Sequence, residues 1–299
     1  MNVFKLKPGN GDWISLSSPA VFHATTSKKY PWFQERDGKV RHYATCPECD
    51  NPIQVINLDV DSRVDGAGRS LPLYAKHVAF NVPGIADYDE DAYNECGLAN
   101  PRSFNGTERR PTNSRFADEI LRLLAREPDT LHIIAERFLE AYIPDELFAA
   151  MLKQFAIQQG HLYRAVTTSN LPFAVLYMSG SQDLFTCKPK SETSPVAQAL
   201  SKSTNFELKS GRIARRTGAK GSLRFFVTDH KQAKSPEDAR PSSEDTGQSM
   251  KLIIEEHIGE EKKPLYGARH ELKDIPYFRN LVGKRERFRE MARELFGDR

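Results

Sequence analysis

Three of the four cysteines in this chain fall between positions 46 and 96, and one histidine lies among them. Cys46 and Cys49 enclose the dipeptide Pro47-Glu48. Two cysteines at this spacing can turn both thiolates toward a common point in a tight knuckle, which supplies half of a tetrahedral zinc site. Pro47 suits such a turn because its ring presets φ.

The other two ligands can come from farther along the chain, because the entropic cost of closing a loop grows only logarithmically with its length. Cys96 and His77 are the nearest candidates and complete a Cys3His set with Cys46 and Cys49. A closed site with four protein ligands is typical of structural rather than catalytic zinc. We therefore predict a structural Zn²⁺ ion as the cofactor.

Two alternatives to zinc remain open for these cysteines. Cys46 and Cys49 could form a disulfide with a redox role, or the thiols could stay reduced and pack as small apolar side chains. If His77 is not the fourth ligand, His42 and Cys187 are the next candidates.

The residues around the cysteines predict antiparallel strands. Positions 1–45 contain short alternating runs at 13–16 and 40–43, the second preceded by the turn Asp37-Gly38-Lys39. Positions 52–60 alternate again and predict a return strand. About the first hundred residues thus resemble a zinc ribbon in general pattern, with the cysteine knuckle at the tip of a hairpin. The second CxxC of that pattern is absent, so the resemblance implies no function.

Carboxylates surround the predicted ligand His77, but their spacing is not that of an EF-hand. We predict a solvated acidic loop whose last members start a helix before Ala92; a second metal site or a catalytic acid pair is the alternative. The residues concerned are Asp59, Asp61, Asp65, Asp87, Asp89, Glu90 and Asp91.

The hydrophobic period becomes helical after a loop at 100–113 that is rich in Pro, Gly, Asn and Arg. Three helices are predicted to begin near Ser114, Thr130 and Pro144, and their short links favour an antiparallel cluster. A helix-turn-helix DNA reader is the alternative, although the third helix carries few of the basic and amide side chains that a recognition helix presents.

Strand signals return at 161–231. We predict a strand at the apolar run 171–178, a short helix at 194–201, and a meander of strands at 206–209, 212–216 and 223–228. Positions 232–249 are rich in Ser, Pro, Glu and Asp, which predicts a flexible insertion before a strand at 251–258. Helical spacing from Pro276 onward predicts a basic amphipathic helix at the end of the chain.

The meander also carries the densest group of basic side chains. Positive charge on a twisted ribbon can follow phosphates, which favours contact with DNA or RNA. A charged, solvated sheet edge is the alternative. The candidate nucleic-acid-binding residues are Lys209, Arg212, Arg215, Arg216, Lys220 and Arg224.

Two catalytic arrangements are weaker alternatives. Asp183 with Glu207 and Lys209 fits the spacing of a metal-dependent nuclease, in which carboxylates hold magnesium. Acid–base chemistry could arise if neighbouring strands brought together a carboxylate and an imidazole. The residues that could do so are Asp229, His230, Glu255, Glu256 and His257.

Composition narrows the class of protein. The net charge of +3 permits a nucleic-acid partner without requiring one. No apolar run approaches the roughly 18 residues that a membrane span needs, and no signal peptide is evident at the start. Few cysteines, most of them in one metal-like cluster, favour a cytoplasmic location.

Together these features predict an α+β protein with a zinc-ribbon-like β region at 1–112, a helical cluster at 113–160 and an antiparallel sheet region with a closing helix at 161–299. The predicted function is a zinc-binding cytoplasmic protein that contacts nucleic acid through a basic hairpin. The alternatives are an effector enzyme or toxin of a bacterial defence or toxin–antitoxin system, and a structural or regulatory subunit with a protein partner in a larger assembly.

Overall fold

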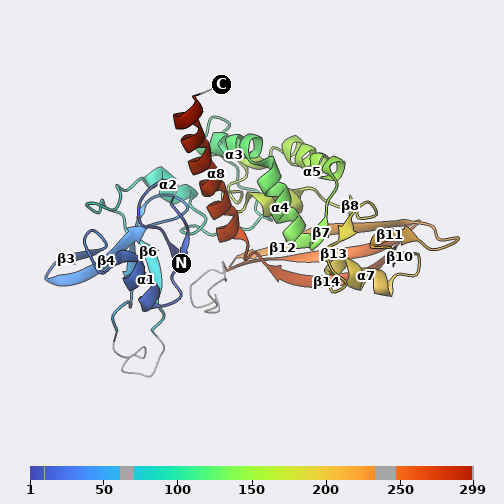
Figure 1. The fold of residues 1–299 in the computed structure, drawn as a ribbon, viewed down its shortest axis with the longest axis horizontal. Helices are drawn as coiled ribbons and strands as arrows, with labels where there is room; N and C mark the ends of the chain where they lie inside the picture. The colour runs from blue at the N-terminus through green and yellow to red at the C-terminus, as the bar shows by residue number, and fades with distance from the viewer. Residues whose placement is uncertain (10, 61–70, 233–246, 298–299) are drawn as a thin grey trace. The chain divides into compact units, whose positions relative to one another are not determined.

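The computed structural model describes residues 1–9, 11–60, 71–232 and 247–297 of the 299-residue chain. Helices and antiparallel sheets are both present, so the predicted α+β class is confirmed (Figure 1). The chain divides into two compact units. Unit 1 takes its main elements from Met1–Arg102 and from the segment that begins at Lys273, and unit 2 comprises Ser103–Gln232 and Gln248–Leu272.

Unit 1 is built on a four-stranded antiparallel sheet with the strand order β3-β4-β5-β6. Its strands are β3 (Phe33–Arg36), β4 (Lys39–Thr45), β5 (Pro52–Ile56) and β6 (Tyr74–His77). A two-stranded sheet of β1 (Val3–Phe4) and β2 (Ile14–Ser15) accompanies it, and the helices are α1 (Pro19–Thr26), α2 (Glu90–Glu95) and α8 (Ile275–Phe296).

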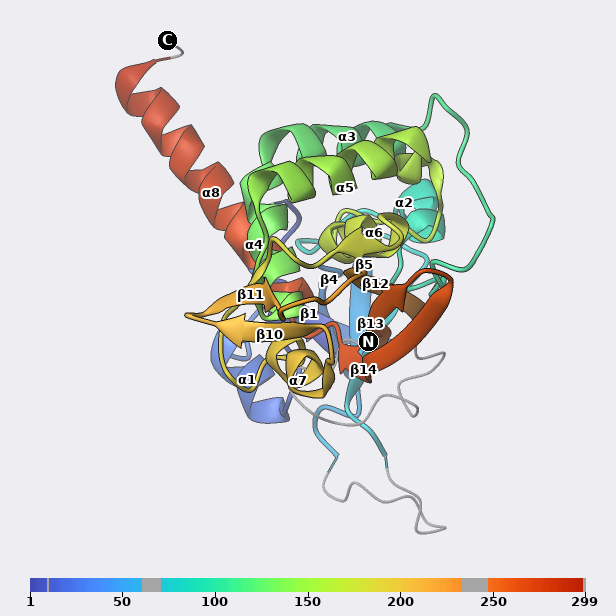
Figure 2. The same ribbon diagram turned by 90° about the vertical axis from the view of Figure 1, so that its right-hand side faces the viewer.

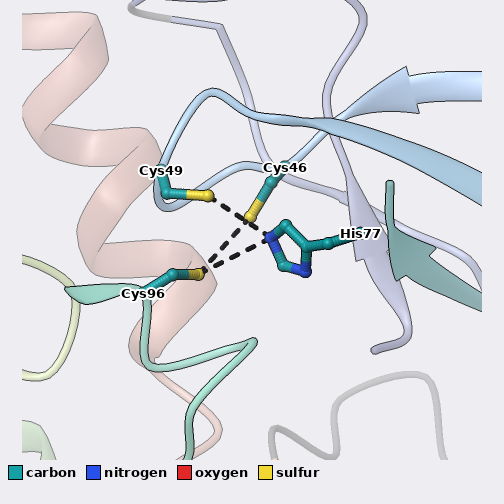
Figure 3. A group of neighbouring side chains, drawn as sticks. All are labelled: Cys46, Cys49, His77 and Cys96. Atoms are coloured by element: carbon teal, nitrogen blue, oxygen red, sulfur yellow. Dashed lines mark hydrogen bonds between the residues drawn. The ribbon is translucent and has the colours of Figure 1, made fainter. Parts of the chain in front are cut away.

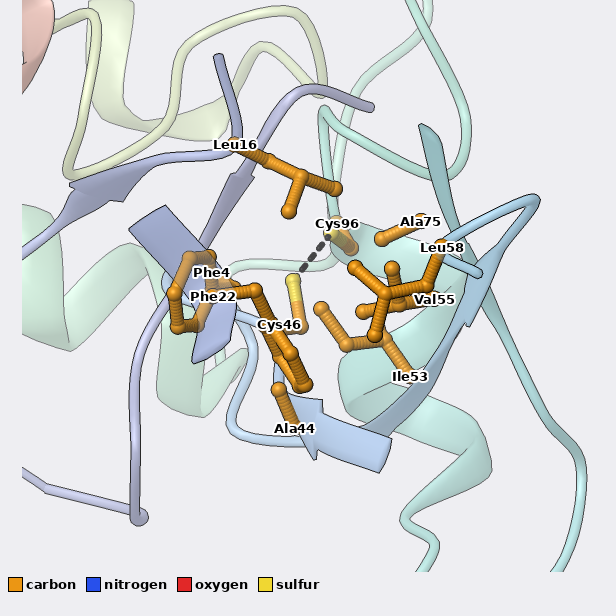
Figure 4. Close-up of a cluster of buried hydrophobic side chains, with 10 residues drawn as sticks. All are labelled: Phe4, Leu16, Phe22, Ala44, Cys46, Ile53, Val55, Leu58, Ala75 and Cys96. Atoms are coloured by element: carbon orange, nitrogen blue, oxygen red, sulfur yellow. Dashed lines mark hydrogen bonds between the residues drawn. The ribbon is translucent and has the colours of Figure 1, made fainter. Parts of the chain in front are cut away.

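Both faces of this sheet are covered, because successive side chains of a strand point to opposite sides. Ala44 belongs to a buried cluster with Phe4, Phe22 and Ile53 (Figure 4), whereas its neighbour Tyr43 packs into a second cluster with residues that follow β6. Apolar residues that lie far apart in the sequence thereby fix the register of the strands in unit 1.

Two details of the predicted first region are wrong. Strands and turns were expected throughout positions 1–45, but Pro19 starts α1, where its fixed φ and missing N–H suit the first helical turn. The return strand expected at 52–60 ends at Ile56, because Asn57 adopts a positive φ of 57° that interrupts the extended backbone.

The predicted C-terminal helix is confirmed as α8. It belongs to unit 1, and the side chains of Ile275 and Phe278 in its first turns are buried. Asn280 holds the main chain of Trp13, since its Oδ1 accepts from the Trp13 N–H at 2.7 Å and its Nδ2 donates to the Trp13 carbonyl at 3.3 Å. No helix within the described ranges is both long and apolar enough to cross a membrane.

Unit 2 contains a second four-stranded antiparallel sheet with the order β14-β13-β12-β8. Its strands are β8 (Gln182–Asp183), β12 (Ser222–Gln232), β13 (Gln248–Ile258) and β14 (Glu261–Glu271). Two ribbons complete the strands: β7 (Ala141–Tyr142) with β9 (Lys188–Pro189), and β10 (Phe206–Lys209) with β11 (Arg212–Arg215). The insertion predicted for 232–249 falls mostly on residues 233–246, which lie outside the described residues.

The helices of unit 2 are α3 (Arg115–Arg126), α4 (Pro128–Leu139), α5 (Asp145–Ile157), α6 (Leu171–Met178) and α7 (Pro195–Lys202), with a 3₁₀ turn at Gly160–Leu162. Four of these five helices correspond to predicted helices, and α6 does not. The predicted start of the second helix at Thr130 is wrong, because α4 already begins at Pro128. The Thr130 hydroxyl donates to Glu127 Oε2 at 2.9 Å instead of capping the helix.

The apolar run at 171–178 was predicted as a strand and is instead the helix α6. This helix, labelled in Figure 2, contacts α4, α5 and β12. Nearly all of its side chains are buried. A segment buried on every side has no polar face, and its sequence therefore lacks the periodicity that separates a helix from a strand.

The single predicted meander is also wrong. β10 and β11 form a separate hairpin, while β12 joins the four-stranded sheet. The two residues left between the predicted strands 206–209 and 212–216 form the hairpin turn: Ser210 and Gly211 both have positive φ, 51° and 72°, as a tight two-residue turn requires. β14 was not predicted, because its sequence is dominated by charged residues.

Candidate metal centre

Four side chains from three parts of unit 1 meet at one point. Cys46 and Cys49 lie in the loop between β4 and β5, His77 is the last residue of β6, and Cys96 follows α2. Their ligand atoms all lie within 4.8 Å of one another (Figure 3). The group could therefore hold a metal ion, with the four residues that the sequence put first.

The separations within the cluster suit tetrahedral coordination. A tetrahedron with Zn–S bonds of about 2.3 Å has S–S edges of about 3.8 Å, and the Cys46 and Cys96 sulfurs are 3.8 Å apart. A shorter Zn–N bond gives mixed edges of about 3.6 Å. The His77 Nε2 atom lies 3.3 Å from the Cys49 sulfur and 3.8 Å from the Cys96 sulfur.

Main-chain hydrogen bonds close the loop that carries Cys46 and Cys49, here called the knuckle. The Cys46 N–H donates to the Asn51 carbonyl at 2.7 Å, and the Asp50 N–H donates to the Cys46 carbonyl at 3.1 Å. Asp50 occupies the left-handed region with φ 62°, and its carboxylate pairs with the buried ammonium of Lys5. These contacts keep the Cys46 and Cys49 side chains on the same side of the loop.

Two further side chains of the knuckle connect it to the segment that carries Cys96. Asn51 Nδ2 lies 3.4 Å from the Cys49 sulfur and donates to the Asp89 carbonyl at 2.9 Å, while the Asp89 N–H donates to Asn51 Oδ1 at 2.6 Å. Glu48 Oε2 accepts from the Leu98 N–H at 3.1 Å. These contacts orient the ligands, as outer-shell partners do at metal sites.

The cluster lies at the edge of an apolar core. Cys46 and Cys96 belong to the buried group shown in Figure 4. Burial raises the pKa of both thiols, whereas hydrogen bonds from these two thiols lower the pKa of Cys49. Burying thiolates costs free energy unless a cation compensates their charge, and a bound divalent cation would do so.

The next candidate ligands lie elsewhere. His42 faces Asp59, whose other oxygen lies 2.8 Å from His23 Nε2. Burial is the main reason that the pKa of His42 is lowered. Cys187 belongs to unit 2, where burial raises the pKa of its thiol to about 12. All four cysteines are free thiols, so the alternative disulfide between Cys46 and Cys49 is not formed.

One carboxylate of the predicted acidic loop, that of Asp89, caps a helix. Asp89 caps α2 by accepting from the Ala92 N–H at 2.9 Å, as the predicted helix start requires. Asp61 and Asp65 lie outside the described residues. The four candidate ligands are thus recognisable from the sequence, whereas the roles of Asn51 and Glu48 are not. The only signal for them is their position inside and beside the CxxC loop.

The six predicted basic residues do not all share one hairpin. Lys209 and Arg212 flank the turn of β10–β11, and Arg224 lies on β12 in the other sheet. Three of the six have defined partners within unit 2. Arg215 donates to the Gly221 carbonyl at 2.5 Å, Arg216 pairs with Glu207 at 2.9 Å, and Arg224 donates to Ser181. Lys220 is exposed in the connection to β12.

The side chains of the two weaker catalytic arrangements make contacts within the fold. Asp183 Oδ1 accepts from the Phe185 N–H at 2.8 Å, and Glu207 holds Arg216. His257 pairs with Glu255 at 2.6 Å. Glu256 is buried and accepts from Ser203 Oγ at 2.6 Å; burial alone would raise its pKa, but this and neighbouring hydrogen bonds lower it.

His230 is buried in unit 2 rather than placed for catalysis. The Phe104 N–H donates to its Nδ1 at 3.1 Å, so the neutral ring carries its proton on Nε2, 3.2 Å from Gln248 Oε1. The Phe104 ring stacks on the imidazole with a centroid distance of 4.0 Å. Both ring nitrogens are therefore used within the fold.

Comparisons of this chain with protein-family models, with curated proteins and with solved structures find no match.

Proposed function

We propose that this protein binds one Zn²⁺ ion through Cys46, Cys49, His77 and Cys96, and that the ion stabilises unit 1. The convergence of three thiols and one imidazole nitrogen within 4.8 Å carries this proposal. Thiolate-rich donor sets prefer soft or borderline ions, and four protein ligands leave no position for a substrate. The ion would join the β4–β5 loop, the end of β6 and the segment after α2.

Metal analysis of the purified protein tests the identity of the ion. We expect about one zinc per chain, retained through dialysis without added metal. Replacement by Co²⁺ should give the absorption of a tetrahedral thiolate complex. A folded protein that contains no metal and takes up neither ion would contradict the proposal.

We further propose that the protein contacts nucleic acid through the β10–β11 hairpin. The placement of Lys209 and Arg212 supports this function: both side chains are exposed beside a tight turn, where they can approach phosphates. Lys220 adds a third exposed cation. Arg215 and Arg216, by contrast, also stabilise the hairpin, so they are poor positions for testing charge alone.

The double variant Lys209→Glu, Arg212→Glu should therefore weaken binding without disturbing the fold. We expect the slope of log Kd against log salt concentration to fall by about 1.4 on single strands, since each phosphate contact contributes about 0.7. Fluorescence anisotropy with labelled oligonucleotides over a salt series measures this slope.

The matched control is Lys251→Glu, Lys262→Glu, which reverses two exposed lysines of β13 and β14 and changes the net charge equally. This control should keep most of the affinity. Equal losses in both variants would mean that only the net charge matters, and the hairpin would then not be the binding surface.

A further inference from the structure

An exposed aromatic ring with two lysine ammonium groups over it lies close to the basic hairpin in unit 2. Tyr142 is 52% exposed, although its neighbour Ala141 is completely buried. In the β7–β9 ribbon Tyr142 is paired with Lys188, and residues paired across two strands present their side chains on the same face. Lys190, two residues farther along, points to that face as well.

The contacts around this ring are defined. The Lys190 Nζ atom lies 5.0 Å from the centre of the Tyr142 ring, and the Lys188 Nζ atom lies 5.9 Å from it. Lys190 also pairs with Glu136 at 3.1 Å, which holds its ammonium group over the ring. An aromatic ring is thus exposed to solvent with positive charge over it.

The hairpin turn extends this surface. A Cβ atom built on Gly211 would lie 3.7 Å from the Cε atom of Lys188, so the turn and the lysine are neighbours. The exposed cations that flank the turn, Lys209 and Arg212, therefore lie near Lys188, which also contacts the Tyr142 ring. We call these five residues the Tyr142 surface: Tyr142, Lys188, Lys190, Lys209 and Arg212.

We propose that the Tyr142 surface binds single-stranded nucleic acid, with a base stacked on the Tyr142 ring and the neighbouring cations on phosphates. This inference rests on the proposed nucleic-acid contact and specifies its ligand. Base stacking on an exposed aromatic ring is available to unpaired bases, whereas the bases of a duplex are already stacked on each other. Cationic side chains beside such a ring supply the sequence-independent attraction to the backbone.

The test compares Tyr142→Ala with Tyr142→Phe in the full-length protein. The probes are labelled single strands of DNA and RNA of about 12 nucleotides, a length within the usual site size, and the duplex of the same sequence. We expect Tyr142→Ala to weaken binding to a single strand by about tenfold or more, and Tyr142→Phe to change it by less than about twofold, because stacking needs only the ring. Duplex binding should not distinguish the two variants.

The matched control is Tyr277→Ala, which removes a tyrosine of similar exposure, 46%, from α8 in unit 1. It should leave binding unchanged. If Tyr142→Ala binds single strands like the wild type while the Lys209→Glu, Arg212→Glu variant is weakened, the stacking inference is overturned and the hairpin proposal stands. If the wild type binds neither single strands nor duplex, both proposals fail.

Discussion

A Cys49→Ser variant is expected to lose its metal and to destabilise unit 1 selectively. A hydroxyl is a poor ligand for zinc, and the three remaining donors would leave buried thiols without the compensating cation. Loss of a structural metal is among the largest effects that a single substitution can have, and we expect a decrease in the free energy of unfolding of more than about 4 kcal/mol.

The two tryptophans of the chain allow the unfolding of unit 1 to be followed separately. Both of its tryptophans, Trp13 and Trp32, lie in unit 1, where the Trp32 indole N–H donates to the Leu6 carbonyl at 3.0 Å. Tryptophan fluorescence during urea unfolding therefore reports on unit 1, and metal content is measured on the same samples. Hydrogen exchange of the β12 and β13 amides reports on unit 2, which should unfold as in the wild type.

The matched control is Cys187→Ser, which makes the same chemical change at a buried cysteine of unit 2. It should retain the metal and leave the tryptophan transition in place. Removing the ion from the wild-type protein with a chelator should reproduce the Cys49→Ser transition, and zinc should restore only the wild type. A Cys49→Ser protein with full zinc content and unchanged unfolding would exclude a ligand role for Cys49.

The sequence was most informative where chemistry restricts geometry. Cys46, Cys49 and Cys96 could be predicted to bind a common metal ion, because cysteines at this spacing serve few roles in proteins. His77 followed as the histidine lying between them. The contacts of Asn51 with Cys49 and Asp89 could not be predicted, since an asparagine beside a knuckle has no distinctive pattern and its partner is supplied by the fold.

Tertiary burial accounts for the main errors. Leu171–Met178 forms a helix because α4, α5 and β12 surround it, and a sequence without a polar face does not reveal such surroundings. Helical spacing with Leu131, Ile134 and Phe138 predicts Tyr142 inside the second helix, but α4 ends at Leu139 and Tyr142 lies on β7. Its exposure and its lysine neighbours depend on the pairing of β7 with β9, two strands of only two residues each.

The second large expected effect is a pH dependence of stability that originates at His230. Burial lowers the pKa of His230 to about 4 in the folded protein, with the positive charge of Arg269 acting in the same direction and the Gln248 contact opposing it. A histidine in the unfolded chain has a pKa of about 6.5. Between these two values the unfolded state binds the additional proton, so this contribution to stability is complete above about pH 6.5 and is lost as the pH falls toward 4.

Replacing His230 with Asn should remove this dependence. Its Oδ1 atom can accept from the Phe104 N–H, but the side chain does not titrate. Between about pH 7.5 and pH 5 the wild type should lose about 2 kcal/mol more than the variant. The measurement is the free energy of unfolding of unit 2 at both pH values, obtained from hydrogen exchange of the β12 and β13 amides.

Phe104→Leu separates this titration from the packing of the ring. That variant loses the aromatic stack at 4.0 Å but keeps the imidazole, so it should be less stable at every pH and should retain the wild-type difference between the two pH values. If His230→Asn shows the same pH difference as the wild type, His230 does not carry the effect. The neutral ring held between Phe104 and Gln248 would then be accessible to protons in the folded state, in conflict with its 2% exposure.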